Sequence, residues 1–189
     1  MDGVLIDSYE AWYELVRHGR EVLGGPHVSR DFFHAGWGQG VDADIKTFFP
    51  GSTMEQVERY YEDNFTRYSG HVVVNSDARP VLAELKARGV STAVISNTPG
   101  PLTRKILEAL DLRADLALGG ADAGRPKPAP DLLLAACKRF ALEPRHALMV
   151  GDSRYDEEAA RAAVIRFAGL GRDGDVRLGR LGELLDLVQ

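Results

Sequence analysis

The stretch Ala147-Leu148-Met149-Val150-Gly151-Asp152-Ser153-Arg154-Tyr155-Asp156 contains the pattern that decides the fold of this chain. It opens with a short apolar run of the kind found in buried strands. A glycine and an acidic residue end that run, and a helical pattern follows from about Asp156 to Ala163. A buried strand that leads through a polar turn into a helix is typical of α/β proteins.

The same alternation of short apolar runs and helical patterns extends on both sides of this stretch. Other apolar runs lie near residues 92–95, 116–118 and 164–168, and helical patterns cover about 77–88, 102–110, 131–140 and 178–188. Strands that alternate with helices of this length predict a parallel sheet with helices on both faces.

The first third of the chain has a different pattern. Apolar residues recur at helical spacing from Tyr9 to about Gly24, and a second helix starts at Ser52, where Ser52-x-x-Glu55 fits a capping box. Residues 31–51 show weaker periodicity, and residues 9 to about 75 contain no convincing strand. We therefore predict a discontinuous α/β core formed by residues 1–9 and 76–189, with a helical insert of residues 10–75.

The composition excludes several classes of protein. With 23 Lys and Arg against 28 Asp and Glu, the formal net charge of −5 does not favour binding to nucleic acid or to an anionic membrane. The one cysteine, Cys137, excludes internal disulfides and is expected to be a packed, inert thiol. No apolar run approaches the roughly 18 residues that cross a bilayer, and residues 1–8 lack the features of a signal peptide. We expect a cytoplasmic globular protein; the oligomeric state stays open.

Polar side chains follow the predicted strands at the edge where open α/β sheets bind their ligands. Ser96 and Asn97 come after one strand and Asp152 after another, and Asp2 lies where the chain would leave a strand. Lys127 lies in a loop that its prolines should hold stiff. Carboxylates suit Mg²⁺, and a hydroxyl and a lysine suit phosphate oxygens. The set points to Mg²⁺-assisted phosphoryl transfer.

Each of these residues also has a purely structural explanation. Asp152 and Ser153 could cap the helix that follows, with Ser153-x-x-Asp156 as a capping pair. Ser96 could be a turn residue, and a lone loop lysine such as Lys127 is usually only solvated. The five histidines have no metal-type spacing, so structural or surface roles are expected for them. The ordered set, rather than any single position, supports a catalytic site.

Four segments in order resemble the motifs of the haloacid dehalogenase superfamily, in particular its phosphoglycolate phosphatase-like branch. Residues 1–8, Met-Asp-Gly-Val-Leu-Ile-Asp-Ser, are similar to the end of the first motif, D-x-D-G-[TV]-L-x-D-S. Val94-Ile95-Ser96-Asn97 is similar to the second motif, Lys127-Pro128-Ala129-Pro130 to the third, and residues 151–156 to the fourth, G-D-x-x-x-D. The resemblance implies a Rossmann-like core, with the helical insert as the mobile cap of the family.

The resemblance implies a catalytic role for three residues. Asp2 would be the general acid that protonates the leaving oxygen and the general base that later activates water. Its backbone carbonyl would help to bind Mg²⁺, the cofactor that the resemblance implies. Ser96 and Lys127 would hold the transferring phosphoryl group, with Lys127 offsetting its charge.

The remaining matching positions would bind metal or substrate. The resemblance implies that Asp152 ligates Mg²⁺ directly and that Asp156 supports the metal shell or holds Lys127. Gly3 and Asn97 would lie close to the phosphate or the substrate. The Gly-Asp order at the fourth motif favours a phosphatase over the sugar-phosphate mutases of the family, and Asp2 argues against a dehalogenase.

The chain departs from the family pattern at its start. The nucleophile of the family is an aspartate two positions before the acid and base, which would fall immediately before Met1. Without it the aspartyl-phosphate route cannot run, so we expect little or no phosphatase activity from the chain as written from Met1. Met1 would then be an internal residue of a natural chain that begins upstream. The alternative is a relative that binds phosphate without turnover.

Within the insert, the loop Gly36-Trp37-Gly38-Gln39-Gly40 is the candidate for substrate selection. Its glycines allow the backbone close to a ligand, while Trp37 offers a stacking face and Gln39 an amide. The alternative is a glycine-rich turn with Trp37 in the core of the insert. The function predicted is hydrolysis of a small, phosphoglycolate-like phosphomonoester. A non-catalytic phosphate- or partner-binding protein and a sugar phosphomutase are the alternatives.

Overall fold

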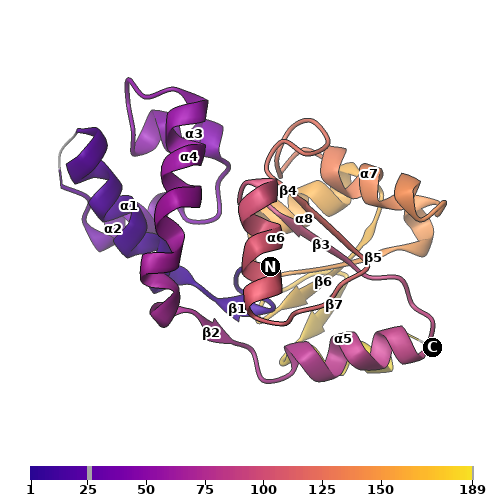
Figure 1. Ribbon diagram of the computed structural model, residues 1–189. Helices are drawn as coiled ribbons and strands as arrows, with labels where there is room; N and C mark the ends of the chain where they lie inside the picture. The colour runs from indigo at the N-terminus through magenta and orange to yellow at the C-terminus, as the bar shows by residue number, and fades with distance from the viewer. Residues whose placement is uncertain (25–26, 189) are drawn as a thin grey trace.

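The computed structural model describes residues 1–24 and 27–188 and has an α/β core. The strands of this core are β3 (Ala93–Ser96), β4 (Leu116–Gly119), β5 (Leu148–Gly151), β6 (Arg166–Leu170) and β7 (Val176–Leu178). They pair in parallel as β3–β4 and as β5–β6–β7 (Figure 1). The predicted α/β fold with parallel strands is confirmed.

Helices cover both faces of these strands. On one face, α5 (Ala78–Ala87) and α6 (Gly100–Ala109) pack with Val94 and other buried strand residues. On the opposite face, α7 (Asp131–Arg139) and α8 (Arg154–Ala162) pack with Ile95 and its neighbours. Since consecutive side chains of a strand point to opposite faces, an apolar strand such as β3 needs cover on both. Among the residues described, no helix has the length and apolar character to cross a membrane.

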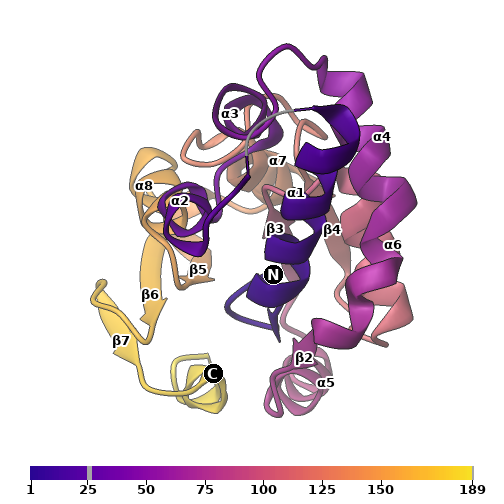
Figure 2. The same cartoon turned by 90° about the vertical axis from the view of Figure 1, so that its left-hand side faces the viewer.

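The strands form two sheets rather than the single sheet that the sequence predicts. In the described part of the chain, β3 and β5 are not hydrogen-bonded to each other, and the N-terminal end lies between them (Figure 2). This end forms a turn, in which the Met1 carbonyl accepts hydrogen bonds from the amides of residues 4–6. Ser96, the last residue of β3, bonds to Asp2, and Asp152, just after β5, faces Gly3. The carboxyl ends of both sheets therefore meet at this turn.

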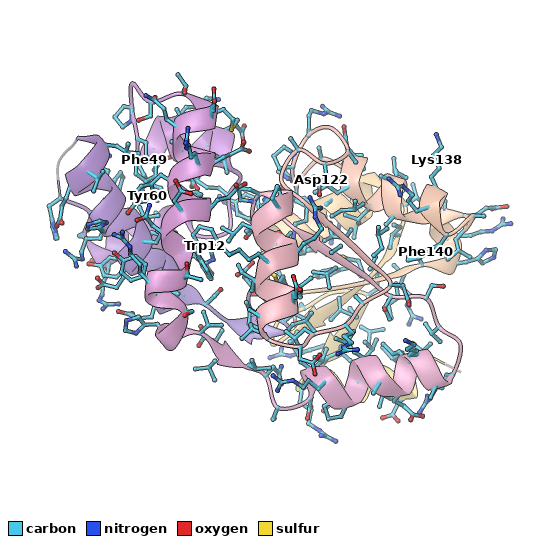
Figure 3. The ribbon with its side chains drawn as sticks, in the orientation of Figure 1. Trp12, Phe49, Tyr60, Asp122, Lys138 and Phe140 are labelled. Atoms are coloured by element: carbon cyan, nitrogen blue, oxygen red, sulfur yellow. The ribbon has the colours of Figure 1, made fainter. Side chains whose placement is uncertain are left out.

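A helical region lies beside the core, and we refer to residues 10–75 as the cap region. It contains the following elements: α1 (Tyr9–Leu23), α2 (Arg30–Gly36), α3 (Val41–Thr47), α4 (Met54–Asn64) and the 3₁₀ helix η1 (Phe65–His71). Aromatic side chains fill its interior, where Trp12, Phe49 and Tyr60 gather (Figure 3). The ring centroids of Trp12 and Tyr61 lie 5.1 Å apart in an edge-on arrangement. This packing holds the short helices together.

Two predicted features near the ends of the cap region and of the chain are wrong. Strand β2 (Val73–Val74) lies where no strand was predicted and pairs antiparallel with β1 (Ile6–Asp7). The helix predicted at 178–188 is a shorter 3₁₀ helix, η3 (Leu181–Asp186), and it is preceded by β7, an unpredicted strand that adds in parallel to β6. The free edge of β6 offers hydrogen bonds to residues 176–178, and Gly179 and Gly182 disfavour a helix.

Smaller corrections concern where helices begin. The capping box of α4 is formed by Thr53 and Gln56, one residue after the predicted Ser52-x-x-Glu55. Thr53 N donates to Gln56 Oε1 over 2.8 Å, and Gln56 N donates to Thr53 Oγ1 over 3.3 Å. The weakly periodic residues 31–51 contain most of α2 and all of α3, which have seven residues each and are too short for a clear periodic signal. A further 3₁₀ helix, η2 (Pro144–His146), precedes β5.

Candidate active site

The carboxylate of Asp2 accepts hydrogen bonds from four side chains. Its Oδ1 accepts from Ser8 Oγ over 2.5 Å and from Trp12 Nε1 over 3.3 Å. Its Oδ2 accepts from Ser96 Oγ over 3.2 Å and from Thr98 Oγ1 over 3.5 Å. All four donor residues are buried. The contacts fix the orientation of Asp2 and bring it directly to Ser96, the residue expected to hold phosphate.

Lys127 forms a buried ion pair with Asp156. The Nζ of Lys127 donates to Asp156 Oδ1 over 2.6 Å and to the carbonyl of Ile95 over 3.3 Å. The other oxygen of Asp156 accepts from the amide and the hydroxyl of Ser153, so the predicted Ser153–Asp156 capping box of α8 is present. Burial tends to raise the pKa of Asp156, but the charge of Lys127 and the hydrogen bonds lower it below its usual value. Asp156 thus positions Lys127.

Asn97 joins three segments of the chain. Its Oδ1 accepts from the backbone amide of Lys127 over 2.8 Å, and its Nδ2 donates to the Lys127 carbonyl over 2.9 Å. The same Nδ2 donates to the carbonyl of Gly38, in the cap region, over 3.0 Å. Asn97 therefore connects the end of β3 with the lysine loop and with the loop of the cap region that was expected to select substrate.

Asp152 and Gly3 lie against each other. A Cβ atom at Gly3 would lie 1.9 Å from Asp152 Oδ2, and Gly3 has a φ of +71°. Only glycine fits both the space and the backbone conformation. Burial raises the pKa of Asp152, and the negative charge of Asp156 raises it further. A cation beside Asp152 would relieve both effects.

The residues present fit a magnesium ion. The carboxylate of Asp156 is bound through both oxygens to Lys127 and Ser153, and that of Asp2 to its four donors, which leaves the carboxylate of Asp152 and the backbone carbonyl of Asp2 for the ion. Within residues 1–24 and 27–188 there is no cluster of three or more His, Cys, Asp or Glu suited to a metal. Mg²⁺ does not require one, because it usually keeps several waters and binds one or two carboxylates together with phosphate oxygens.

A cavity of about 80 Å³ lies between the core and the cap region. The expected site residues that line it are Asp2, Trp37, Gln39, Ser96, Asn97, Lys127, Asp152 and Asp156. Gly3 borders it through its contact with Asp152. Trp37 lines the cavity and also packs against Tyr9 and Phe33, with ring centroids 5.2 and 5.6 Å away. The structure thus brings the expected residues to one place. Trp37 both borders the cavity and packs within the cap region, which are the two arrangements considered for it.

Four residues of the site were not predicted from the sequence: Ser8, Trp12 and Thr98, which donate to Asp2, and Asp44, which lines the cavity. Ser8 belongs to the first motif, and Thr98 closely follows Ser96 at a strand end, so both carry a local signal. No local sequence pattern marks Trp12 or Asp44 as a site residue, since their contacts depend on how helices of the cap region pack.

Comparisons with known proteins find relatives of this chain. A family model described as haloacid dehalogenase-like hydrolase matches residues 1–170. Phosphoglycolate phosphatase of Escherichia coli (strain K12) is 34% identical over 156 residues, which are 79% of this chain and 57% of that relative. This chain thus spans little more than half the length of that relative.

Solved structures share the fold. A HAD-superfamily hydrolase of subfamily IA, variant 1, from Geobacter sulfurreducens PCA has a TM-score of 0.74 at 25% identity, over 99% of this chain and 95% of that one. A hydrolase from Pseudomonas syringae has a TM-score of 0.82 at 22% identity, with coverages of 99% and 95%. With the family model matching most of its length, the chain belongs to the haloacid dehalogenase-like hydrolase family.

Proposed function

We propose that this member of the haloacid dehalogenase-like hydrolase family hydrolyses a small phosphomonoester with the help of Mg²⁺. The observation that carries the proposal is the arrangement around one cavity. The Asp2–Ser96 hydrogen bond and the buried Lys127–Asp156 ion pair, which come from distant parts of the sequence, both line it. An acid, a hydroxyl and a lysine around one small space can bind a phosphoryl group and protonate its leaving oxygen.

Each side chain has a defined part in this proposal. Lys127 offsets negative charge on the phosphoryl group, and its pairing with Asp156 keeps the ammonium in place. The hydroxyl of Ser96 donates a hydrogen bond either to Asp2 or to a phosphate oxygen. Asp2 protonates the leaving oxygen and later takes a proton from the attacking water. Mg²⁺, held by the backbone carbonyl of Asp2 and the carboxylate of Asp152, would neutralise charge on the phosphoryl oxygens.

The proposed reaction also needs a nucleophile, which the family pattern places one position before Met1. We therefore expect little or no turnover from the chain as written from Met1, and turnover when the chain is extended upstream so that an aspartate precedes Met1. The similarity to phosphoglycolate phosphatase makes phosphoglycolate the first natural ester to test.

The test compares the two chains with p-nitrophenyl phosphate and Mg²⁺. The extended chain should release p-nitrophenol, and Asp152→Asn in that chain should abolish the release, whereas the chain from Met1 should release none. Activity of the chain from Met1 that depends on Mg²⁺ and on Asp152 would refute the assigned nucleophile. Binding of inorganic phosphate by the extended chain without any turnover would show a non-catalytic binding protein instead.

A further inference from the structure

The cap region contributes one carboxylate to the cavity. From this region, the described residues that line the cavity are Trp12, Val16, Phe33, Gly36, Trp37, Gly38, Gln39, Val41, Asp44, Phe48 and Tyr61. Among them Asp44 is the only acidic residue, and none is a lysine, an arginine or a histidine. A ligand bound to Ser96 and Lys127 would therefore extend toward a wall that is aromatic and apolar except for Asp44 and its two partners.

The carboxylate of Asp44 is held by two neutral donors. Gln39 Nε2 donates to its Oδ1 over 2.9 Å, and the hydroxyl of Tyr61 donates to its Oδ2 over 2.8 Å. A carboxylate has about four lone-pair positions, so each oxygen can accept a further hydrogen bond. Neither donor neutralises the charge, and burial raises the pKa of Asp44 to about 7. The site is preorganised to accept hydrogen bonds from a group inside the cavity.

We propose that Asp44 is a specificity-determining residue, which accepts a hydrogen bond from the leaving group of the substrate and rejects leaving groups that carry a carboxylate. This inference rests on the proposed phosphatase function and narrows its substrate class. The substrate is a phosphate ester of an alcohol that bears a second hydrogen-bond donor, a hydroxyl or an ammonium group, and no further negative charge. Phosphoglycolate falls outside this class, so on this inference the chain differs in its substrate from the phosphoglycolate phosphatase to which it is similar.

The physical reason is charge repulsion in a poorly solvated space. Two carboxylates close together in a site with little water repel each other strongly, and like charges juxtaposed across an interface cost several kcal/mol. Phe33 and Phe48 cannot offset that charge, and Gln39 and Tyr61, which donate to Asp44, are neutral. A hydroxyl or an ammonium group can instead donate a hydrogen bond to the carboxylate of Asp44.

A set of three esters of similar size tests the inference. The chain is titrated by calorimetry, at pH 8 with Mg²⁺, with 2-hydroxyethyl phosphate, phosphoethanolamine and phosphoglycolate; inorganic phosphate is titrated in parallel. Binding, rather than turnover, is measured, so the test does not depend on the nucleophile. We expect phosphoglycolate to bind at least about tenfold more weakly than each of the other two esters.

Variants assign the preference to Asp44. Asp44→Asn should reduce the difference to roughly twofold or less, mainly by improving phosphoglycolate binding, while inorganic phosphate binds as before. The matched control is Asp42→Asn, which removes an exposed negative charge two residues away and should keep the full preference.

The outcomes separate the inference from the function on which it rests. If inorganic phosphate and all three esters fail to bind to the unaltered chain, the proposed function fails. If phosphate binds and phosphoglycolate binds as tightly as the other esters, only the assignment of Asp44 fails. A preference that persists unchanged in Asp44→Asn also overturns that assignment.

Discussion

Ser96 Oγ lies 3.2 Å from Asp2 Oδ2, although 94 positions separate the two residues in the sequence. Ser96 is the last residue of β3, and Asp2 belongs to the turn that lies between the two parallel sheets. The proposed acid and base therefore shares a hydrogen bond with the proposed phosphate-binding hydroxyl. Much of the proposed chemistry depends on side chains held in this way by segments distant in sequence, which leads to four further predictions.

The buried ion pair makes Asp156 important for stability as well as for the position of Lys127. Asp156→Asn removes the charge that offsets the Lys127 ammonium, and leaving a buried charge without its partner costs about 3–5 kcal/mol. The free energy of unfolding, measured with urea, should fall by that amount. The control is Asp131→Asn, in which the partner Arg125 is largely exposed, and it should cost much less. Equal losses in both variants would contradict this account.

Asp44 should make the stability depend on pH. Burial raises its pKa to about 7, against the hydrogen bonds from Gln39 and Tyr61, and the exposed Asp42 adds to the rise. A carboxyl whose pKa is raised by folding stabilises the fold fully below the unfolded-state pKa, near 3.8, and this contribution is lost as the pH rises through about 7.

Urea unfolding at pH 5 and pH 8 checks this dependence. From the lower to the higher pH, the unaltered chain should lose roughly 1–3 kcal/mol more stability than Asp44→Asn, whose side chain does not titrate. Identical changes in the two proteins would show that Asp44 titrates normally in the folded state.

Gly3 should tolerate no side chain. In Gly3→Ala the added Cβ would overlap the carboxylate of Asp152, so Asp152 must move away from the place where it would bind Mg²⁺. We expect the stabilisation of the fold by Mg²⁺ and phosphate, measured as a rise in Tm, to disappear. Gly51 has a φ of +94° and no atom within 4 Å of an added Cβ, so Gly51→Ala should lose only about 1 kcal/mol and keep the rise in Tm. A normal response of Gly3→Ala would refute the close contact.

Asn97 should couple the cap region to the lysine loop. Asn97→Ala removes the hydrogen bonds to the backbone of Lys127 and to Gly38, and each buried backbone group left unpaired costs about 1–3 kcal/mol. Hydrogen exchange at residues 36–40 and at 127 should become faster, while exchange in α7 stays the same. Asn97→Asp keeps the acceptor for the Lys127 amide but loses the donor to the carbonyls of Gly38 and Lys127, so it should speed exchange at 36–40 more than at the Lys127 amide. Unchanged exchange at 36–40 in both variants would rule out the coupling.

Patterns of residues close together in the sequence were sufficient to predict much of the α/β core and the main candidate site residues. Apolar runs marked β3 and β5, and the polar residues that follow them, Ser96 and Asp152, lie at the turn where the sheets meet. This works because a strand end, a helix cap and a motif are encoded by residues close together in sequence. The same reasoning was less accurate near the C-terminus, where spaced leucines suggested an α-helix at 178–188 but residues 176–178 pair with the edge of β6 and residues 181–186 form a 3₁₀ helix.

The α/β class could be predicted from local patterns alone, as could the helical character of most of the cap region and the ordered set of motif residues, because each depends on local periodicity or on residues a few positions apart. The folded structure was needed to show that Trp12 and Thr98 donate to Asp2, that Asn97 reaches Gly38, and that Asp44 lies in the cavity beside Tyr61. These contacts join residues 10 to 96 positions apart. They arise when helices pack against strands and against each other, and packing of this kind leaves no periodic trace in the sequence.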